Sequence, residues 1–517
     1  MKRNYKEIYK SITLDGFFSE YLPPCFKLDE LMFKNPPKYD CDLIQPYSFT
    51  MSRFNTNDSR RTIFIPEIGA YAVLNEYIKN NQILEEITGF IDSNQFSFSK
   101  IIMEDGSIRK HEQVYGEEIT EGEKINSQYI DNVVKKLILS AGAKKVLKLD
   151  IANCFSSFYT HYIPAIILGY EKAEENYKKN LRGEQVEETY KKYSKLDEII
   201  RKQNKNQTNG LLVGPIISKI IVEGLLSRID IELRNKGLLF TRYVDDYEVY
   251  LFDDNEDYVK SIFISVLKKY GLNLNFEKVE ILDFPYYTVN NFDKIIEFYS
   301  GDKVEDYDLM QLFNDFFEIE KSGTKGAIRY LLKCLENEPI NVGNKDLFDS
   351  YILTIMSNNS RSLTKACSLL IKNKMGSKVN EKHVEHIKSM IVINVKKDYD
   401  LEVIWLLYVL IETNNIVKDD SVVNIILESD NEIAKIMLLR KNLISNVEII
   451  KQEAKSWILN YELFASDFID IDELCEIIPL NRNKIIYEKL KEQRQKQREA
   501  VTAPLDGETG NGGTSAQ

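Results

Sequence analysis

The chain has 517 residues, a length that predicts two to four domains rather than one. Hydrophobic residues make up 43%, typical of a soluble globular protein, and the longest apolar run, Val403 to Ile411, is about half of a membrane span. The N-terminus lacks the apolar core of a signal peptide, so we expect a cytoplasmic protein without membrane contact. The net charge of −12 argues against loose, non-specific binding of nucleic-acid duplexes, although a local basic channel is compatible with it.

From the start to about residue 300, short β-branched and aromatic runs alternate with helical segments, which predicts a mixed α/β unit. Arg60 and Arg61 open an apolar strand in this part. Arginine forks suit triphosphate oxygens, so the pair is a candidate substrate clamp, with an ordinary salt-bridged pair as the alternative. The segment from Gln82 to Asn126 contains polar loops with glycine, and the sequence assigns no role to it.

A strand of alternating pattern, Lys145 to Asp150, ends in a single aspartate, and Phe155 follows five positions later. Such an aspartate is usually a cap or turn residue, so its meaning depends on a second carboxylate. Further along, Gly214 and Pro215 precede an amphipathic run. Glycine before a helix permits close backbone approach to a nucleotide, which makes Gly214 a candidate binding residue, although Gly-Pro is often only a turn.

The strongest signal is the segment Leu239 to Phe252, where two apolar strand-like runs flank Asp245 and Asp246. A β-hairpin places these carboxylates at its tip, within reach of a divalent metal, whereas strands otherwise disfavour aspartate. Nucleotidyl transfer by two metals needs carboxylates from two strands, because one ion activates the attacking hydroxyl and the other holds the leaving group. Asp150 and Asp245 would supply that pair. A solvated turn is the alternative for the hairpin taken alone.

The run from Gly271 to Lys278 is strand-like and ends in a lysine that can neutralise or protonate a departing pyrophosphate; a plain surface lysine is the alternative. Beyond about residue 305 the strand signals vanish, and amphipathic stretches such as Asp346 to Lys374 and Asn446 to Phe464 predict helices or helix pairs. Several open with Asp or Asn, which act as N-caps. No strict period is present, so we expect an irregular stack of helical hairpins. Residues 501–517 are polar and Gly-rich, and we expect them to be disordered.

The order of these motifs resembles the palm of reverse transcriptases: an aspartate strand, a Gly-Pro helix, a Tyr-Val-Asp-Asp hairpin and the Lys278 strand. The fit spans residues 55 to 290. This resemblance implies a metal site and an aromatic that crowds the sugar 2′ position and so selects deoxynucleotides. The residues concerned are Asp150, Asp245, Asp246 and the backbone carbonyl of Ile151 for the metal, and Phe155 for the sugar.

The segments Phe158 to Pro164 and Ser59 to Ile78 are similar to bacterial abortive-infection (Abi) reverse transcriptases, including their shorter prophage-encoded members. That resemblance implies an N-terminal segment and fingers over residues 1–139, a palm over 140–300 and an α-helical-repeat (HEAT-like) domain over 301–500 in place of a thumb. It also implies defence against phage by DNA synthesis without a template, with the DNA attached covalently to a tyrosine of the enzyme, and a tendency to form homo-oligomers.

One departure favours synthesis without a template. Templated reverse transcriptases usually show Leu-Pro-Gln-Gly in the middle motif, where the glutamine helps to position the templating base pair. Here the corresponding stretch is Leu211 to Gly214, and the apolar side chain of Val213 cannot make those hydrogen bonds. Leu212 also replaces the proline that is common in the abortive-infection group.

The first hypothesis is therefore a DNA polymerase of the reverse-transcriptase type that acts in phage defence, with two Mg²⁺ ions, or Mn²⁺ instead, as cofactors. Its partners would be dNTPs and a single-stranded DNA product attached to the protein. The priming tyrosine is unknown; the candidates near the fingers are Tyr5, Tyr9, Tyr39 and Tyr47.

Two rival hypotheses remain. A templated polymerase using a dedicated RNA would need a basic surface and a thumb-like helix just after residue 290, and the acidic segment Phe284 to Tyr307 indicates neither. A catalytically silent scaffold is disfavoured, because clustered carboxylates repel one another without metal.

Overall fold

The structure is a computed structural model that describes most of the chain. The described residues are 3–26, 28, 45–52, 59–109, 127–287, 292–299, 303–337, 339–374, 379–477, 487–488, 491–492 and 495–496. The tail predicted to be disordered, 501–517, and one priming candidate, Tyr39, lie outside these residues.

The N-terminal part mixes strands and helices, which confirms the predicted α/β unit. Its first elements are α1 (Tyr5–Leu14), β1 (Tyr47–Ser52), β2 (Arg60–Ile65), α2 (Ile68–Asn80), α3 (Ile83–Asp92) and α4 (Ser127–Leu139). After β3 (Lys145–Asp150) come α5 (Cys154–Ser157), η3 (Thr160–Tyr162), α6 (Ala165–Leu168), α7 (Tyr170–Leu181), α8 (Glu188–Lys202) and α9 (Ile216–Asn235). The last are β4 (Phe240–Tyr243), β5 (Asp246–Leu251), α10 (Glu256–Lys269), η4 (Phe276–Lys278) and β6 (Glu280–Asp283).

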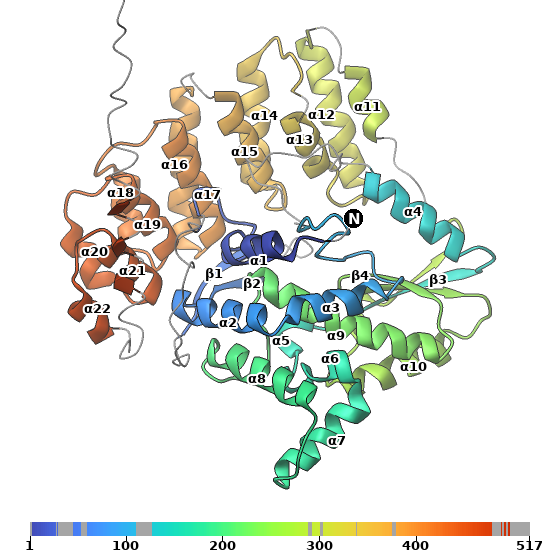
Figure 1. Cartoon of the computed structure of the whole chain (residues 1–517). Helices are drawn as coiled ribbons and strands as arrows, with labels where there is room; N and C mark the ends of the chain where they lie inside the picture. Colours follow the sequence, from blue (N-terminus) through green and yellow to red (C-terminus); the bar gives the residue numbers. More distant parts are fainter. Residues whose placement is uncertain are drawn as a thin grey trace, which may run out of the picture.

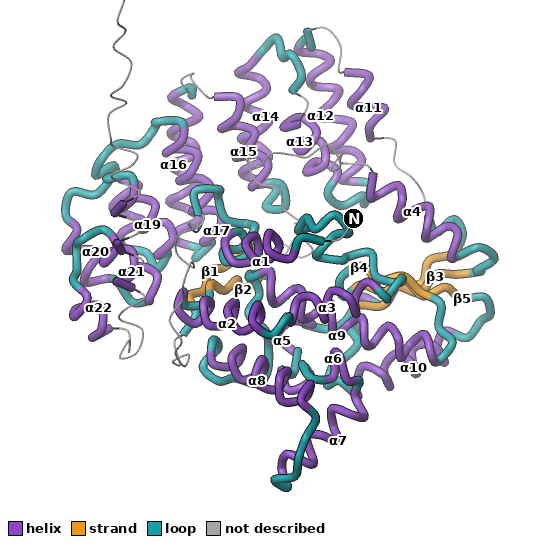
Figure 2. The backbone as a smooth tube through the Cα atoms, viewed as in Figure 1, coloured by secondary structure: helices purple, strands orange, loops and turns teal. Residues whose placement is uncertain are grey.

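Four antiparallel strands form the central sheet, in the order β4-β5-β3-β6. Figure 2 labels β3, β4 and β5 of this sheet. Strand residues alternate between the two faces, so Tyr247 points away from its neighbour Asp246. Tyr247 is buried and its ring packs 4.9 Å from that of Phe263 in α10. The register pairs Asp150 with Asp246, so both aspartates belong to the opposite face, away from α10.

The C-terminal part is built of helices, as predicted, and β6 is the last named strand among the described residues. Figure 1 shows these helices as a curved row beside the N-terminal part. They are α11 (Phe292–Tyr299), α12 (Asp306–Lys321), α13 (Ala327–Asn337), α14 (Lys345–Asn358), α15 (Leu363–Lys374), α16 (Glu381–Lys396), α17 (Asp400–Glu412), α18 (Ser421–Leu427), α19 (Glu432–Arg440), α20 (Val447–Glu453), α21 (Trp457–Ala465) and α22 (Ile471–Ile477). The helix α11 lies just after residue 290, where the acidic sequence indicated no helix, so that expectation was wrong. The lack of a helix at this place therefore no longer argues against a templated polymerase.

Several helices begin where a polar side chain caps them, as the sequence predicts. The side-chain oxygens of Asn344, Asn380, Asp420, Asn431 and Asn446 each accept a hydrogen bond from a backbone N–H of the first turn. The two long amphipathic stretches each form a pair of helices, α14 with α15 and α20 with α21.

The apolar run Val403 to Ile411 forms the middle of α17, and all of its residues are buried in the protein core. Among the described helices, none has both the length and the apolar character that crossing a membrane requires.

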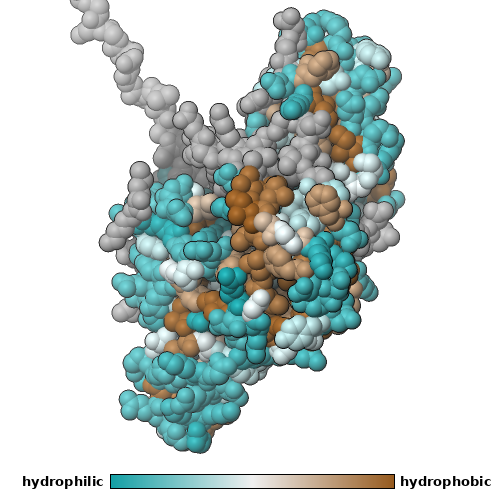
Figure 3. All heavy atoms as spheres, turned by 90° about the vertical axis from the view of Figure 1, so that its right-hand side faces the viewer, coloured by the Kyte–Doolittle hydropathy of each residue, from teal (hydrophilic) through white to brown (hydrophobic). Residues whose placement is uncertain are grey.

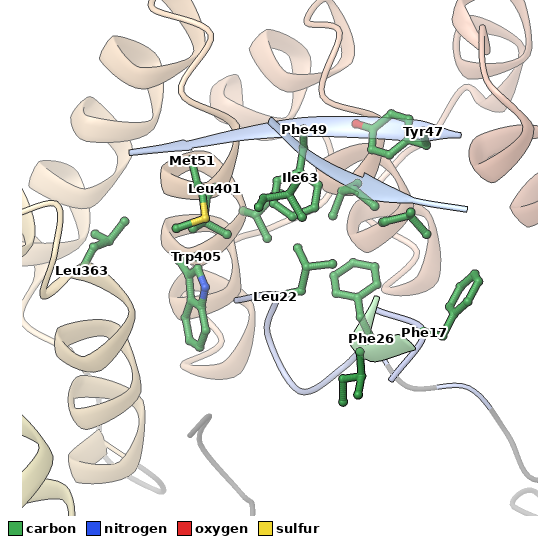
Figure 4. Close-up of a cluster of buried hydrophobic side chains, with 14 of the residues drawn as sticks. Phe17, Leu22, Phe26, Tyr47, Phe49, Met51, Ile63, Leu363, Leu401 and Trp405 are labelled. Atoms are coloured by element: carbon green, nitrogen blue, oxygen red, sulfur yellow. The ribbon is translucent and has the colours of Figure 1, made fainter. Parts of the chain in front are cut away.

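The hairpin of β1 and β2 lies on α17, so the helical part contacts the N-terminal part directly (Figure 4). Phe49, Met51 and Ile63 from the hairpin and Leu401 from α17 belong to the same buried cluster. The indole N–H of Trp405 donates to the carbonyl of Tyr21 at 2.7 Å. One hydrophobic core therefore runs through both parts, while the boundary near residue 300 stays a prediction.

Candidate metal centre

Three carboxylates meet at the tip of the β4–β5 hairpin. Asp150 ends β3, Asp245 lies in the hairpin turn and Asp246 begins β5. One ligand oxygen from each lies within 4.8 Å of the others, a spacing that a divalent cation bound by oxygen ligands can bridge. Asp150 is buried, Asp245 partly buried and Asp246 exposed, so the group opens to solvent on one side. The structure thus brings together the three aspartates that the sequence selected.

Two side chains from the segment before β6 fix the carboxylate of Asp150. Lys278 Nζ lies 2.8 Å from one oxygen, and the amide of Asn275 donates to the other at 2.9 Å. The N–H of Asn275 also donates to the Asp150 carbonyl at 2.8 Å. Burial opposes the charge of Lys278, but the ion pair with Asp150 outweighs it and raises the pKa of the ammonium. Lys278 is therefore a fixed cation beside the aspartates, at the end of a 3₁₀ turn rather than of the expected strand.

The aspartates repel one another in the absence of metal. Desolvation and the charge of Asp150 raise the pKa of Asp245. Desolvation, together with the charge of Asp245 and a hydrogen bond with Asp150, raises the pKa of Asp246 to about 7. Perturbed carboxylates of this kind concentrate at functional sites, where a bound cation or a proton relieves the repulsion.

Metal affinity is expected to depend steeply on pH below about 7. Carboxylates bind metal in their deprotonated form, so protons compete for Asp246, whose pKa is about 7. With one competing proton, Mn²⁺ affinity should fall about ten-fold per pH unit below that value. Calorimetric titration of Mn²⁺ between pH 5.5 and pH 8 measures this. An affinity that does not change across that range would contradict the assignment of Asp246 as a ligand.

The metal-free protein should respond to pH in the opposite direction. The folded-state pKa of Asp246 lies above its unfolded value, so the folded state binds more protons and the contribution of this group to stability is lost as the pH rises towards 7.

The two arginines of the predicted substrate clamp separate, because neighbours in a strand point to opposite faces. Arg60 turns towards the helical part, where its guanidinium pairs with both oxygens of Glu402 at 2.6 and 2.8 Å and lies 4.0 Å above the ring of Tyr399. The clamp prediction is therefore not supported for Arg60, whose fork is occupied in joining β2 to α17. Arg61 is exposed, and its charge counteracts the rise in the pKa of Asp245.

Substituting these two arginines separately should give different results. Under the substrate-clamp hypothesis, Arg61→Ala should raise the KM for dNTP about ten-fold and leave the melting temperature unchanged, since it removes one exposed charge that would bind phosphate. Arg60→Ala should lower the melting temperature, because it leaves the buried Glu402 unpaired. Steady-state kinetics and thermal unfolding of both variants measure this. A rise in KM for Arg60→Ala alone would reverse the assignment.

Gly214 has a structural role in the fold, and its contact with substrate stays a prediction. Its φ is +142°, and a Cβ there would lie 2.5 Å from the carbonyl oxygen of Phe64 in β2. The N–H of Phe64 donates to the carbonyl of Val213 at 2.7 Å. The glycine thus permits this loop to pair with β2.

Phe155 and Ile151, the other two predicted contacts, lie close to the aspartates along the chain. The ring of Phe155 is partly buried against the hydrophobic core. Ile151 follows Asp150 directly and donates its N–H to the carbonyl of Asp245 at 3.3 Å. Their roles toward sugar and metal stay predictions.

Two of the candidate priming tyrosines are poorly placed for chemistry. Tyr9 and Tyr47 are each only 8% exposed. The hydroxyl of Tyr9 donates to Glu85, and that of Tyr47 accepts from the backbone N–H of Glu432. Burial raises the pKa of both phenols, which opposes their ionisation. Tyr5 is partly buried in α1, and it is the described candidate that the structure leaves open.

A group of side chains that the sequence did not single out covers the sheet next to the aspartates. Glu248 shares a face of β5 with Asp246, two residues away. Its carboxylate accepts from the hydroxyl of Tyr287 at 2.6 Å and pairs with Lys136 of α4 at 2.9 Å. Tyr286 donates to the carbonyl of Ser140 at 3.2 Å. The end of α4 and residues 286–287 therefore occupy this part of the sheet face.

No family model matches the sequence, and no curated protein matches it. Solved structures with a partial likeness include telomerase from Candida albicans in complex with a fragment of telomeric RNA (14% identity, 70% of this chain, TM-score 0.29). They also include apo telomerase from Candida tropicalis (11% identity, 88% of this chain, TM-score 0.33). A third is the complex of Candida tropicalis telomerase with a telomeric RNA fragment (13% identity, 72% of this chain, TM-score 0.28). The matched parts span 66%, 70% and 65% of these telomerase chains, so the chain corresponds to about two thirds of their length.

Proposed function

We propose that this protein is a metal-dependent DNA polymerase of the reverse-transcriptase type, which adds dNTPs to a hydroxyl end. The observation that carries the proposal is the set of three aspartates: Asp150 and Asp246 are paired in register on neighbouring strands, and Asp245 lies in the adjoining hairpin turn. An ordinary solvated turn would not bury Asp150 or crowd three like charges together.

The residues present fit a pair of Mg²⁺ or Mn²⁺ ions, because hard cations prefer carboxylate and carbonyl oxygens. Asp150 and Asp245 would hold them, with Asp246 and the carbonyl of Ile151 completing the set. Bound ions would supply activation of the attacking hydroxyl and stabilisation of the leaving pyrophosphate. Lys278 holds Asp150 in place and keeps a positive charge at the site, and Arg61 offers a second positive charge for phosphate oxygens.

We further propose that synthesis needs no template. A templated polymerase must seat a duplex beside its metal centre, whereas here Tyr287 and Lys136 cover the sheet face next to Asp246 by way of Glu248. The apolar Val213 in the middle motif is a second supporting observation. Priming by a tyrosine and a role in phage defence rest on the resemblance to abortive-infection reverse transcriptases.

The test is incorporation of labelled dNTPs with Mg²⁺ and without added nucleic acid. The enzyme is used with and without prior RNase treatment, and products are separated on a denaturing gel before and after protease, beside an Asp245→Ala, Asp246→Ala double variant. Label that migrates with the protein, shifts after protease and is lost in the variant supports the proposal. Label that is lost when the enzyme is treated with RNase before the dNTPs are added would favour the alternative of a templated polymerase using a dedicated RNA.

The predicted self-association has a candidate contact surface on α4. Val134, Leu137 and Ile138 form a stripe at helical spacing with exposures of 47%, 47% and 69%. Hydrophobic residues gather on the side of the protein that Figure 3 shows, the right-hand side of Figure 1, where α4 lies. Exposed apolar patches of this kind are typical of protein interfaces.

A charged substitution in the stripe should therefore weaken self-association. We expect Ile138→Glu to shift the sedimentation coefficient towards that of a monomer, because burying the new carboxylate in an interface is unfavourable. Glu175→Lys on the exposed face of α7 is the control for a change of surface charge. An unchanged assembly in Ile138→Glu would place the interface elsewhere.

A further inference from the structure

The residue before the two adjacent aspartates has an unusual backbone conformation. Tyr243 pairs with Asp246, so Val244 and Asp245 form a two-residue hairpin loop. Val244 has a φ of +56°. In such loops the first position usually carries glycine, asparagine or aspartate, because a positive φ brings a Cβ too close to the backbone. For a β-branched residue the conformation is strained and persists only where its surroundings impose it.

Two buried side chains hold both backbone polar groups of Val244. The hydroxyl of Ser99 accepts from the Val244 N–H at 2.8 Å. The guanidinium of Arg242 donates to the Val244 carbonyl, also at 2.8 Å. Ser99 and Arg242 are each 1% exposed, so water does not compete for these bonds. We call these two side chains the hairpin clamp.

The hairpin clamp is itself anchored in the protein core. Arg242 forms buried ion pairs with Glu223 and Asp230 of α9, each at 2.8 Å. Ser99 belongs to a segment that runs beside β4, where Phe98 N–H donates to the Arg242 carbonyl at 2.8 Å. Ser99 also donates to Glu223 at 3.3 Å. The hairpin clamp thus fixes the hairpin turn relative to α9.

We propose that Ser99 and Arg242 are positioning residues for the metal centre, acting through the backbone of Val244. Holding this residue at positive φ turns the next peptide so that Asp245 and Asp246 face Asp150. The inference rests on the proposed metal centre and deepens it. When a residue that orients metal ligands without touching the metal is removed, the affinity of the protein for the metal typically falls 10–100-fold.

The test compares Ser99→Ala, Val244→Gly and the double variant by calorimetric titration of the metal-free protein with Mn²⁺. Ser99→Ala should weaken binding about ten-fold. Glycine adopts positive φ without a Cβ clash, so Val244→Gly should bind as the wild type does, and the double variant should bind within about three-fold of it. Such a rescue is not expected if Ser99 only fills space in the core.

Ser97→Ala is the matched control. Ser97 is also a buried serine of the same segment, 5% exposed. Its hydroxyl forms a hydrogen bond with that of Ser99 at 3.3 Å and accepts from the Ser99 N–H at 3.2 Å, but it does not bond to Val244. Ser97→Ala therefore removes a buried hydroxyl next to Ser99 and leaves the bond from Ser99 to Val244 in place. We expect it to leave Mn²⁺ affinity unchanged. Melting temperatures of all variants, measured without metal, report any loss of folding separately.

Three results would overturn the hairpin clamp. They are wild-type Mn²⁺ affinity in Ser99→Ala, a loss of Mn²⁺ affinity in Ser97→Ala equal to that in Ser99→Ala, or no recovery of affinity in the double variant. A wild-type protein that does not bind Mn²⁺ would overturn the clamp and the metal centre together. A wild-type protein that binds Mn²⁺ but incorporates no dNTP would overturn the proposed activity and leave the clamp supported by the calorimetric series.

Discussion

Asp245→Asn should abolish dNTP incorporation and at the same time raise the melting temperature of the metal-free protein. The loss of activity follows from the removal of a metal ligand. Residues that only orient ligands account for 10–100-fold effects, so loss of a ligand should cost at least about 100-fold in kcat. Asparagine keeps the shape of aspartate but not the charge that a divalent ion requires.

The gain in stability follows from the electrostatics of the same site. Desolvation and the charge of Asp150 raise the pKa of Asp245, so at neutral pH its negative charge destabilises the folded state. Replacement by a neutral amide removes that repulsion. An aspartate with only a structural role would differ in its effect on stability. Its replacement would lower the melting temperature, with or without a loss of activity.

Incorporation of labelled dNTPs and thermal unfolding in a chelator measure the two effects on one preparation. Asp253→Asn is the matched control, since Asp253 is exposed beyond the far end of β5. A lower melting temperature in Asp245→Asn, or activity within ten-fold of the wild type, would contradict the metal centre. Saturating Mg²⁺ should reverse the order of stability, because only the wild type gains from binding the ion.

Local patterns were sufficient to predict the aspartate strand and the hairpin. Apolar alternation predicted β3, and two apolar runs around adjacent aspartates predicted β4 and β5. The same holds for the helical part, where each cap and apolar stripe lies within one helix. These features depend only on residues that are close together in the chain, so they can be predicted from a single sequence.

Residues whose partners lie far away in the chain could not be assigned. Ser99 and Asn275 carry no local motif, and their roles arise from contacts with Val244 and Asp150, more than a hundred residues away. The interpretation of Arg60 as part of a substrate clamp was reasonable locally, since either face of its strand could have been the one that meets the substrate. The sequence does not say which face α17 covers, and that contact decided its partner.

The remaining prediction concerns Arg242, which is both a part of the hairpin clamp and the centre of a buried charge network. Arg242→Met should lower the free energy of unfolding by about 3–5 kcal/mol, because it leaves Glu223 and Asp230 as buried charges without a partner. Urea unfolding measures this quantity. Arg234→Met, an exposed position on α9, should remain within about 0.5 kcal/mol of the wild type.

Adding Glu223→Gln and Asp230→Asn to Arg242→Met tests the cause of the loss. If uncompensated charge dominates, the triple variant should recover most of the stability, since neutral amides are far less costly to bury. If lost packing dominates, it should be no more stable than Arg242→Met. In either case the triple variant lacks the hydrogen bond to the Val244 carbonyl, so its Mn²⁺ affinity should stay low. Recovery of stability without recovery of metal binding would separate the two roles of Arg242, one in the stability of α9 and the hairpin, the other in the placement of the aspartates.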